Sequence, residues 1–286
     1  MAYSHNAPFR ADVVGSYLRP AELKAAREDF AAGKIDAAAL KAVEDKAITE
    51  LVAKQKAAGL HVITDGEFRR GWWHFDFMWG FNGVDHAAAA HRVAFHDEVT
   101  PADTATVTGR ISGENHPFVE HFKFVKQFED ENTVARQTMP SPAQTRFVLT
   151  GNAAAYPYDE FYKNDDELTA DIVAAYRQVI ADLYAAGCRN VQFDDDRSGD
   201  FAPLAEVSGD KKVVLGLITS KKPDLEDPDT IKARIQEAAQ YIPLDRLCLS
   251  TQCGFASTQE GNKLTEDQQW AKIALVQSIA KDVWGE

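Results

Sequence analysis

One unit recurs along this chain: a segment with helical spacing, a glycine or proline, a short apolar run, and polar residues directly after it. The apolar runs lie at 11–16, 61–67, 136–142, 190–196, 212–220 and 247–250. This alternation predicts an α/β protein with a parallel sheet and right-handed crossovers, and a length of 286 residues favours a (βα)8 TIM-type barrel over an open sheet. The sequence contains six such units, whereas a closed barrel needs eight.

The bulk composition narrows the class of protein. A net charge of -13 disfavours a nucleic-acid partner, because such binding depends on clustered lysine and arginine. No apolar stretch approaches the ~20 residues of a membrane span, and the first residues do not resemble a signal peptide. Three cysteines without C-x-x-C spacing fit a reducing compartment, so we expect a cytoplasmic protein.

Polar side chains follow most of the predicted strands, and the carboxyl ends of parallel strands meet at one rim. Ser16, Glu67, Asp194 and Cys253 are therefore expected to converge. Each has a simpler explanation. Ser16 could complete a turn, Glu67 could pair with Arg69 or Arg70, residues 194–196 could be a solvated run, and Cys253 could be a small buried residue.

Two further stretches bear on the site and on the domain organisation. The segment from Phe68 is rich in aromatic residues, and Trp72, Trp73 and Phe75 are predicted to form a pocket wall. Residues 86–130 are predicted to leave the barrel as a hairpin (92–95 with 104–111) followed by a helix (117–128). The run 212–220 is almost continuously apolar, which predicts a strand buried on both faces.

The strand exits resemble those of the cobalamin-independent methionine synthase family, and especially its short single-barrel relatives. The matching stretches occur in family order over nearly the whole chain: Arg10–Pro20, Thr64–Phe77, Met139–Pro142, Gly187–Asp195, Val214–Lys221 and Cys248–Thr258. The resemblance implies an eight-stranded barrel that transfers a methyl group from a methyltetrahydrofolate to the thiol of homocysteine on a zinc ion.

The resemblance also assigns roles to residues. Glu67 and Asp194 would be the catalytic carboxylates that hold the ammonium group of homocysteine, and Ser16 with its backbone would hold the carboxylate. Cys253 matches the last zinc ligand. Zinc coordination would keep the substrate thiol as the nucleophilic thiolate. Trp72, Trp73 and Phe75 suit the flat ring of a pterin.

The chain departs from the family at one place. Two βα units, which correspond to strands 5 and 6 and carry a His-x-Cys pair and a glutamate as zinc ligands, are missing at about residues 194–197. Gln192 stands where the glutamate would fall if this strand is aligned with strand 6. His74, Asp195 and Asp196 are the remaining candidate ligands, and a catalytic zinc needs about three.

Three explanations of the missing units stay open: a segment absent from this chain alone, a naturally shortened relative, or two chains that complete one barrel as a swapped dimer or other oligomer. We therefore predict one barrel domain over 1–286 and a homocysteine methyltransferase acting on small molecules. The rival is a metal-free relative that binds an amino acid without catalysis. A porphyrin decarboxylase is disfavoured because it would need a pocket rich in arginine, whereas these exits offer carboxylates and a cysteine. The methyl donor stays open.

Overall fold

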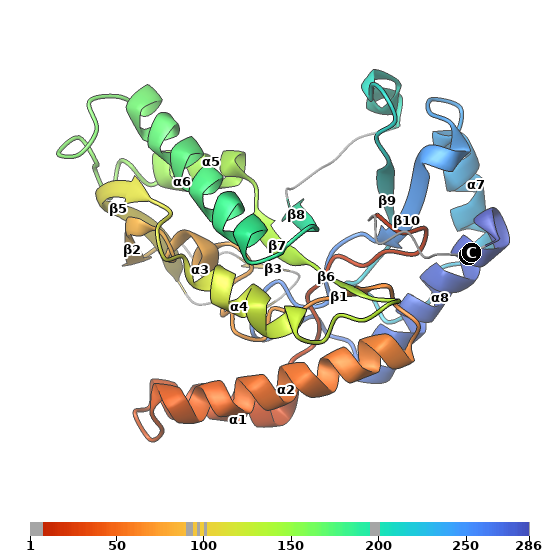
Figure 1. Cartoon of the computed structure of the whole chain (residues 1–286), viewed down its shortest axis with the longest axis horizontal. Helices are drawn as coiled ribbons and strands as arrows, with labels where there is room; N and C mark the ends of the chain where they lie inside the picture. Colours follow the sequence, from red (N-terminus) through yellow and green to blue (C-terminus); the bar gives the residue numbers. More distant parts are fainter. Residues whose placement is uncertain (1–7, 90–93, 96–97, 100–101, 195–200, 286) are drawn as a thin grey trace. The chain divides into compact units, whose positions relative to one another are not determined.

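The computed structural model describes residues 8–89, 94–95, 98–99, 102–194 and 201–285. The chain divides into two compact units (Figure 1). The first comprises Met1–Arg69, Glu129–Val134 and Asp196–Glu286, and the second comprises Arg70–Phe128 and Ala135–Asp195. Each unit is described by itself. None of the helices in the described ranges is long and apolar enough to cross a membrane.

The first unit is an α/β arrangement around parallel strands. Its elements are α1 (Ala21–Ala31), α2 (Ala37–Ala57), β1 (Val62–Ile63), the 3-10 helices η1 (Ala202–Glu206) and η2 (Leu244–Arg246), β9 (Val213–Ile218), α7 (Pro228–Ala238), β10 (Leu247–Thr251) and α8 (Glu266–Trp284). β10 pairs in parallel with β9. Parallel bridges then join Ala11 to Leu249 and Ser16 to Gly66. The order in space is β9, β10, residues 11–16 and residues 62–66.

Local sequence signals start two helices of this unit. The Asp36 side chain accepts a hydrogen bond from the backbone of Ala39 at 2.8 Å and caps α2. Thr265 and Gln268 form a capping box at the start of α8. Apolar side chains of β9, β10, α7 and α8 then form one core, which includes Leu215, Ile218, Ile235, Leu249, Val276 and Ile279.

The predicted first strand, 11–16, is not a continuous strand. Only its ends form bridges, because Gly15 has φ +124° and the Asp12 side chain accepts from the backbone of Val13 at 2.7 Å. The prediction that 212–220 is buried on both faces is also wrong. Val214 and Gly216, which lie on the same face of β9, are both exposed, so that face is not fully covered by the described residues.

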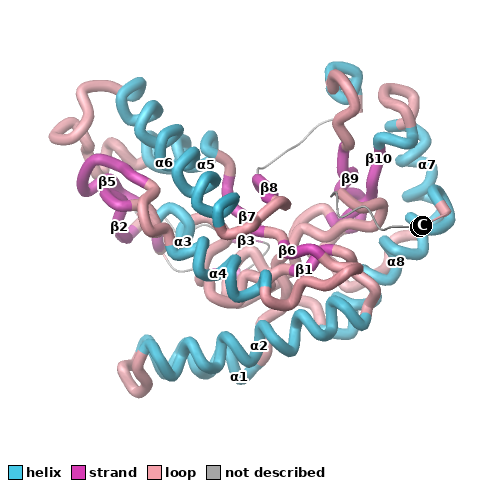
Figure 2. The backbone as a smooth tube through the Cα atoms, viewed as in Figure 1, coloured by secondary structure: helices cyan, strands magenta, loops and turns pink. Residues whose placement is uncertain are grey.

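The described part of the second unit combines a parallel strand pair, two antiparallel pairs and helices (Figure 2). Its elements are α3 (Phe75–Met78), β2 (Asn82–Ala88), β3 (Ala94–Phe95), β4 (Glu98–Val99), β5 (Asp103–Ser112), α4 (Pro117–Lys126), β7 (Gln137–Pro140), α5 (Pro142–Gly151), α6 (Asp165–Ala185) and β8 (Val191–Asp194). β7 and β8 pair in parallel, with Gln137 opposite Val191 and Pro140 opposite Asp194. Ser141 caps α5 by accepting from Gln144.

The predicted hairpin is half right. Residues 104–111 lie in β5 and 117–128 contain α4, as expected, but β5 pairs with β2 rather than with 92–95. Of the latter segment, the described residues 94–95 form β3, which pairs with β4. The run 82–88 was not predicted as a strand, because its alternation includes exposed Asp85 and His86 and only Val84 and Ala87 are buried.

The described strands do not close into a barrel. They form five two-stranded sheets, in which β8 pairs only with β7 and β9 only with β10. β6 (Val134–Ala135) pairs with β1. Closure requires two neighbours for every strand. The deletion point at 194–197 falls at the end of β8, and residues 195–197 lie outside the described residues. One barrel domain over 1–286 stays a prediction.

A glycine contact in the second unit provides a test of the packing. A Cβ at Gly113 would lie 2.3 Å from the carbonyl oxygen of Ala175 on α6, so Gly113→Ala is expected to lower the free energy of unfolding by about 2 kcal/mol. Gly151→Ala is the control, because nothing lies within 4 Å of a Cβ there. Equal urea midpoints for the two variants would contradict the packing.

Candidate active site

Glu67 lies in a tight turn directly after the second predicted strand of the first unit. It is 2% exposed and has φ +60°, a left-handed conformation that is costly for a residue with a Cβ. Its backbone N–H donates to Asp65 Oδ1 at 2.8 Å, and its carbonyl accepts from Arg19 Nη2 at 2.8 Å. These two hydrogen bonds stabilise the strained turn and fix the position of the Glu67 backbone, from which the side chain extends.

Ser16 lies beside this turn and also contacts the loop after β10. Its backbone bridges Gly66, and its carbonyl accepts from the backbone N–H of Phe255 at 3.0 Å. The Ser16 hydroxyl oxygen accepts from the N–H of Ala256 at 3.3 Å. A Cβ at Gly254 would lie 1.8 Å from Ser16 Oγ, so only glycine allows this approach.

Cys253 immediately precedes that glycine and is half-buried at the carboxyl end of β10. Its carbonyl accepts from Thr251 Oγ1 at 2.9 Å. The first unit therefore brings together three of the predicted site segments: the turn with Ser16, the turn with Glu67, and the loop that begins at Cys253.

Arg19 is a site residue that the sequence did not reveal. Its guanidinium is buried, with 4% of the residue exposed, and besides the Glu67 carbonyl it donates to the carbonyls of Ala256 at 3.0 Å and Thr258 at 3.2 Å. All three acceptors are backbone atoms, which no side-chain pattern can indicate. The only local signal is an arginine between the first strand exit and the proline that opens α1.

Asp194 lies in the second unit, as the last residue of β8. Its Oδ1 accepts from Gln192 Nε2 at 2.6 Å, and Gln192 Oε1 accepts from Arg136 Nη1 at 2.7 Å. Gln192 therefore orients the Asp194 carboxylate. It stands where the glutamate ligand of the family would fall if this strand is aligned with strand 6. The convergence of Asp194 with Ser16, Glu67 and Cys253 stays a prediction.

The aromatic segment forms its own cluster within the second unit. Trp72 and Phe75 are buried with their rings 5.2 Å apart, and Trp72 Nε1 donates to Asp103 Oδ2 at 3.0 Å. Trp73 is half-buried. Packing of the segment on itself accounts for the first two side chains, and the pocket wall stays a prediction.

His74 lies among these rings and is 7% exposed. Burial lowers the pKa of its imidazole from 6.5 to about 3, and Nδ1 has no hydrogen-bond partner in the described part of the chain. The ring is therefore neutral at physiological pH.

A zinc site does not follow from these residues. Within the described ranges there is no group of three His, Cys, Asp or Glu side chains that could hold a metal ion. His74 lies among aromatic rings in the second unit, and Asp195 and Asp196 fall outside the described residues. Cys253 alone does not make a catalytic zinc site, which needs about three protein ligands.

Comparisons with protein-family models and with curated proteins agree with one another. The family model described as "Cobalamin-independent synthase, Catalytic domain" matches residues 9–202. The uncharacterized protein YxjH of Bacillus subtilis is 36% identical over 366 aligned positions, which cover 97% of this chain and 95% of that protein. The methionine synthase of Saccharolobus solfataricus is 27% identical over 190 positions, covering 64% of this chain and 51% of that protein.

Solved structures resemble the chain over almost its whole length. The putative vitamin-B12 independent methionine synthase from Listeria monocytogenes has a TM-score of 0.78 at 34% identity, covering 98% of this chain and 99% of that one. A B12-independent methionine synthase from Shewanella sp. W3-18-1, in complex with selenomethionine, has a TM-score of 0.70 at 17% identity, covering 96% and 98%. The second likeness concerns the fold alone.

The lengths of these alignments bear on the missing units. The alignment with YxjH spans 366 positions, 80 more than the 286 residues of this chain, so at least that many positions have no counterpart here. A βα unit takes ~30 residues, from ~250 for eight. The difference has room for the two units that we expected to be missing.

The close approach of Gly254 to Ser16 gives a direct test of the site. Gly254→Ala is expected to lower the free energy of unfolding by more than about 2 kcal/mol, because the new methyl group overlaps the serine hydroxyl. Adding Ser16→Gly removes that hydroxyl and should recover part of the loss. Chemical denaturation of the single and double variants measures both effects, and strictly additive losses would contradict the contact.

The buried imidazole of His74 predicts a pH dependence of stability. Because its pKa is about 3 in the folded chain and about 6.5 when unfolded, the unfolded chain binds the extra proton between these values. The free energy of unfolding should then fall by about 1.4 kcal/mol per pH unit below about pH 6.

His74→Phe removes this proton and should flatten the decline of melting temperature between about pH 6 and pH 4, whereas His61→Gln should not. Parallel pH profiles for wild type and His74→Phe would show that the imidazole is not held neutral.

Proposed function

The chain belongs to the cobalamin-independent methionine synthase family, and on that premise we propose that it is a methyltransferase of the methionine synthase type with homocysteine as acceptor. The observation that carries the proposal is the meeting of Ser16, Glu67 and the loop from Cys253 within the first unit. The family match covers the first two segments, and the third lies beyond its matched residues.

The side chains suit the two ends of an amino acid. A buried carboxylate such as Glu67 can hold an ammonium group, and a hydroxyl beside backbone donors can hold a carboxylate, so Ser16 and its turn are assigned to the latter. Asp194, oriented by Gln192, is the proposed second partner of the ammonium group. Positioning of this kind would aim the thiol of homocysteine at the methyl donor.

The reaction needs a thiolate, because the sulfur–methyl bond forms as the bond from methyl to the donor breaks. A methyltetrahydrofolate-like molecule is the proposed donor, with the aromatic segment from Trp72 to Phe75 as the proposed stacking surface. Zinc is the family's means of holding the thiolate. Since the described residues supply only Cys253 toward it, no step is assigned to a metal here.

A second candidate function is a metal-free relative that binds homocysteine without transferring a methyl group. The observation that favours it is Gln192, which stands at a candidate ligand position and is engaged with Asp194 and Arg136. Zinc analysis of the purified chain separates the candidates. About one zinc per chain supports the methyltransferase, and retained homocysteine affinity without zinc supports the second function.

We also propose a cytoplasmic protein that acts on small molecules rather than on nucleic acid or membranes. Each of β8 and β9 has one edge without a partner among the described strands, and each has an exposed apolar side chain, Phe193 and Val214; both features favour self-association.

Substitution of Glu67 tests the proposed acceptor site. Glu67→Gln keeps the shape of the side chain but removes its charge, so the dissociation constant for homocysteine should rise about tenfold or more. Isothermal titration calorimetry measures this, with Glu28→Gln on exposed α1 as the control. Unchanged affinity in Glu67→Gln would exclude the site.

A further inference from the structure

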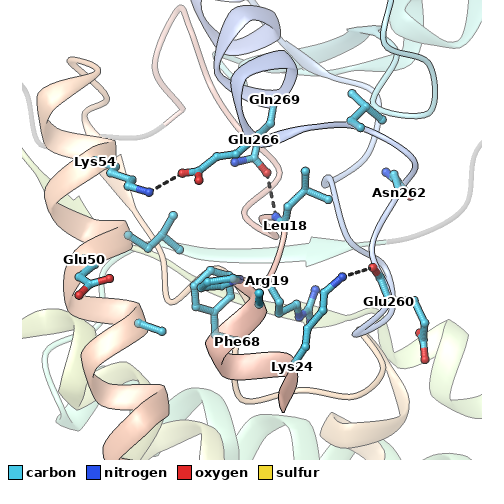
Figure 3. Close-up of a pocket in the computed structure, with 15 residues that line it drawn as sticks. Leu18, Arg19, Lys24, Glu50, Lys54, Phe68, Glu260, Asn262, Glu266 and Gln269 are labelled. Atoms are coloured by element: carbon cyan, nitrogen blue, oxygen red, sulfur yellow. Dashed lines mark hydrogen bonds and ion pairs between the residues drawn. The ribbon is translucent and has the colours of Figure 1, made fainter. Parts of the chain in front are cut away.

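The first unit contains a cavity of about 310 Å³ that is separate from the proposed methyl-transfer site (Figure 3). It lies between α1, α2, the start of α8 and the loop 260–264. Ser16, Glu67 and Cys253 do not line it, although Arg19 and Phe68 do. Its volume is in the range of pockets for small molecules.

The cavity has an apolar floor. Phe68, Leu51 and Ala47 are buried there, and Leu18 and Leu264 are half-buried at its sides. Together they offer a surface on which an aliphatic side chain would lose its contact with water, and this burial favours binding.

One buried amide in the wall bonds to the protein through only one of its two polar atoms. Gln269 on α8 is 1% exposed, and its Oε1 accepts from the backbone N–H of Leu18 at 2.8 Å (Figure 3). Among the described residues none accepts from its Nε2, so this donor is available to a carboxylate in the cavity that Gln269 lines.

Positively and negatively charged side chains surround the opening of the cavity. Lys54 pairs with Glu266, and Glu50 lies one turn earlier than Lys54 on α2 (Figure 3). Lys24 donates to the carbonyl of Glu260 at 2.7 Å. The hydrogen bond from Lys54 lowers the pKa of Glu266, so this carboxylate is ionised at neutral pH. A ligand with a single charge would be repelled by as many of these groups as attract it. A zwitterion can place each of its two charges beside a group of the opposite sign.

We propose that this cavity binds a free amino acid with an aliphatic side chain, in its zwitterionic form. Its carboxylate accepts from Gln269 Nε2, its ammonium group lies beside Glu50, and its side chain packs on Phe68 and Leu51. The proposal goes beyond the methyl-transfer function, because none of these groups belongs to the site at the strand exits.

The test is calorimetric titration of the full chain with L-leucine, which has no thiol. We expect saturable binding of one leucine per chain, and much weaker binding of 4-methylpentanoate and 3-methylbutylamine, which each carry one of the two charges. Glu50→Gln and Gln269→Leu should each weaken leucine binding about tenfold, the effect of losing one charge-assisted hydrogen bond.

Lys41→Met, which changes an exposed side chain of α2 outside the cavity lining, is the matched control and should bind leucine as wild type does. Glu67→Gln should also leave leucine binding unchanged, which separates this site from the homocysteine site. The proposal is overturned by no heat at about 10 mM leucine, by 4-methylpentanoate binding as tightly as leucine, or by normal leucine affinity in Glu50→Gln when circular dichroism shows that the variant is folded.

Discussion

The site of the first unit depends on one buried guanidinium. Arg19 donates to the carbonyls of Glu67, Ala256 and Thr258, and so joins the turn after the second predicted strand to the loop after β10. Charge-assisted bonds of this kind are stronger than those between neutral groups. They offset the strain of the left-handed Glu67, whose N–H also donates to Asp65. Arg19 thus adds a side-chain link to the backbone link that Ser16 makes between the same turn and loop.

Much of this structure follows from signals close together in the chain, which is why sequence reasoning reached it. Asp36 and Thr265 cap their helices, and the apolar runs that became β7, β8, β9 and β10 are each short and bounded by polar residues. The strand expected at 11–16 failed for a local reason, the conformation of Gly15, whereas other misses concern contacts between separate segments. β5 pairs with β2, and Arg19 donates to backbone carbonyls. Neither interaction is encoded in a pattern of side-chain types.

The two units differ in how much of the proposed chemistry they hold. The first has Ser16, Glu67 and Cys253 on neighbouring segments, whereas the second holds Asp194 through Gln192 and Arg136. The strands at which the relatives' additional positions are expected, β8 and β9, each have one unpaired edge among the described strands. The omission of two units that the sequence predicts would remove the expected zinc ligands and would also leave the backbone donors and acceptors of these edges open to a new neighbour.

The left-handed conformation of Glu67 lowers the stability of the fold but places a carboxylate in the proposed site. Glycine adopts φ +60° without strain, so a glycine there would relieve a cost of order 1 kcal/mol or more that the native residue imposes. The same change would delete the buried carboxylate. Selection for thermal robustness alone would therefore favour loss of this side chain, so the glutamate is present at a cost to the stability of the fold.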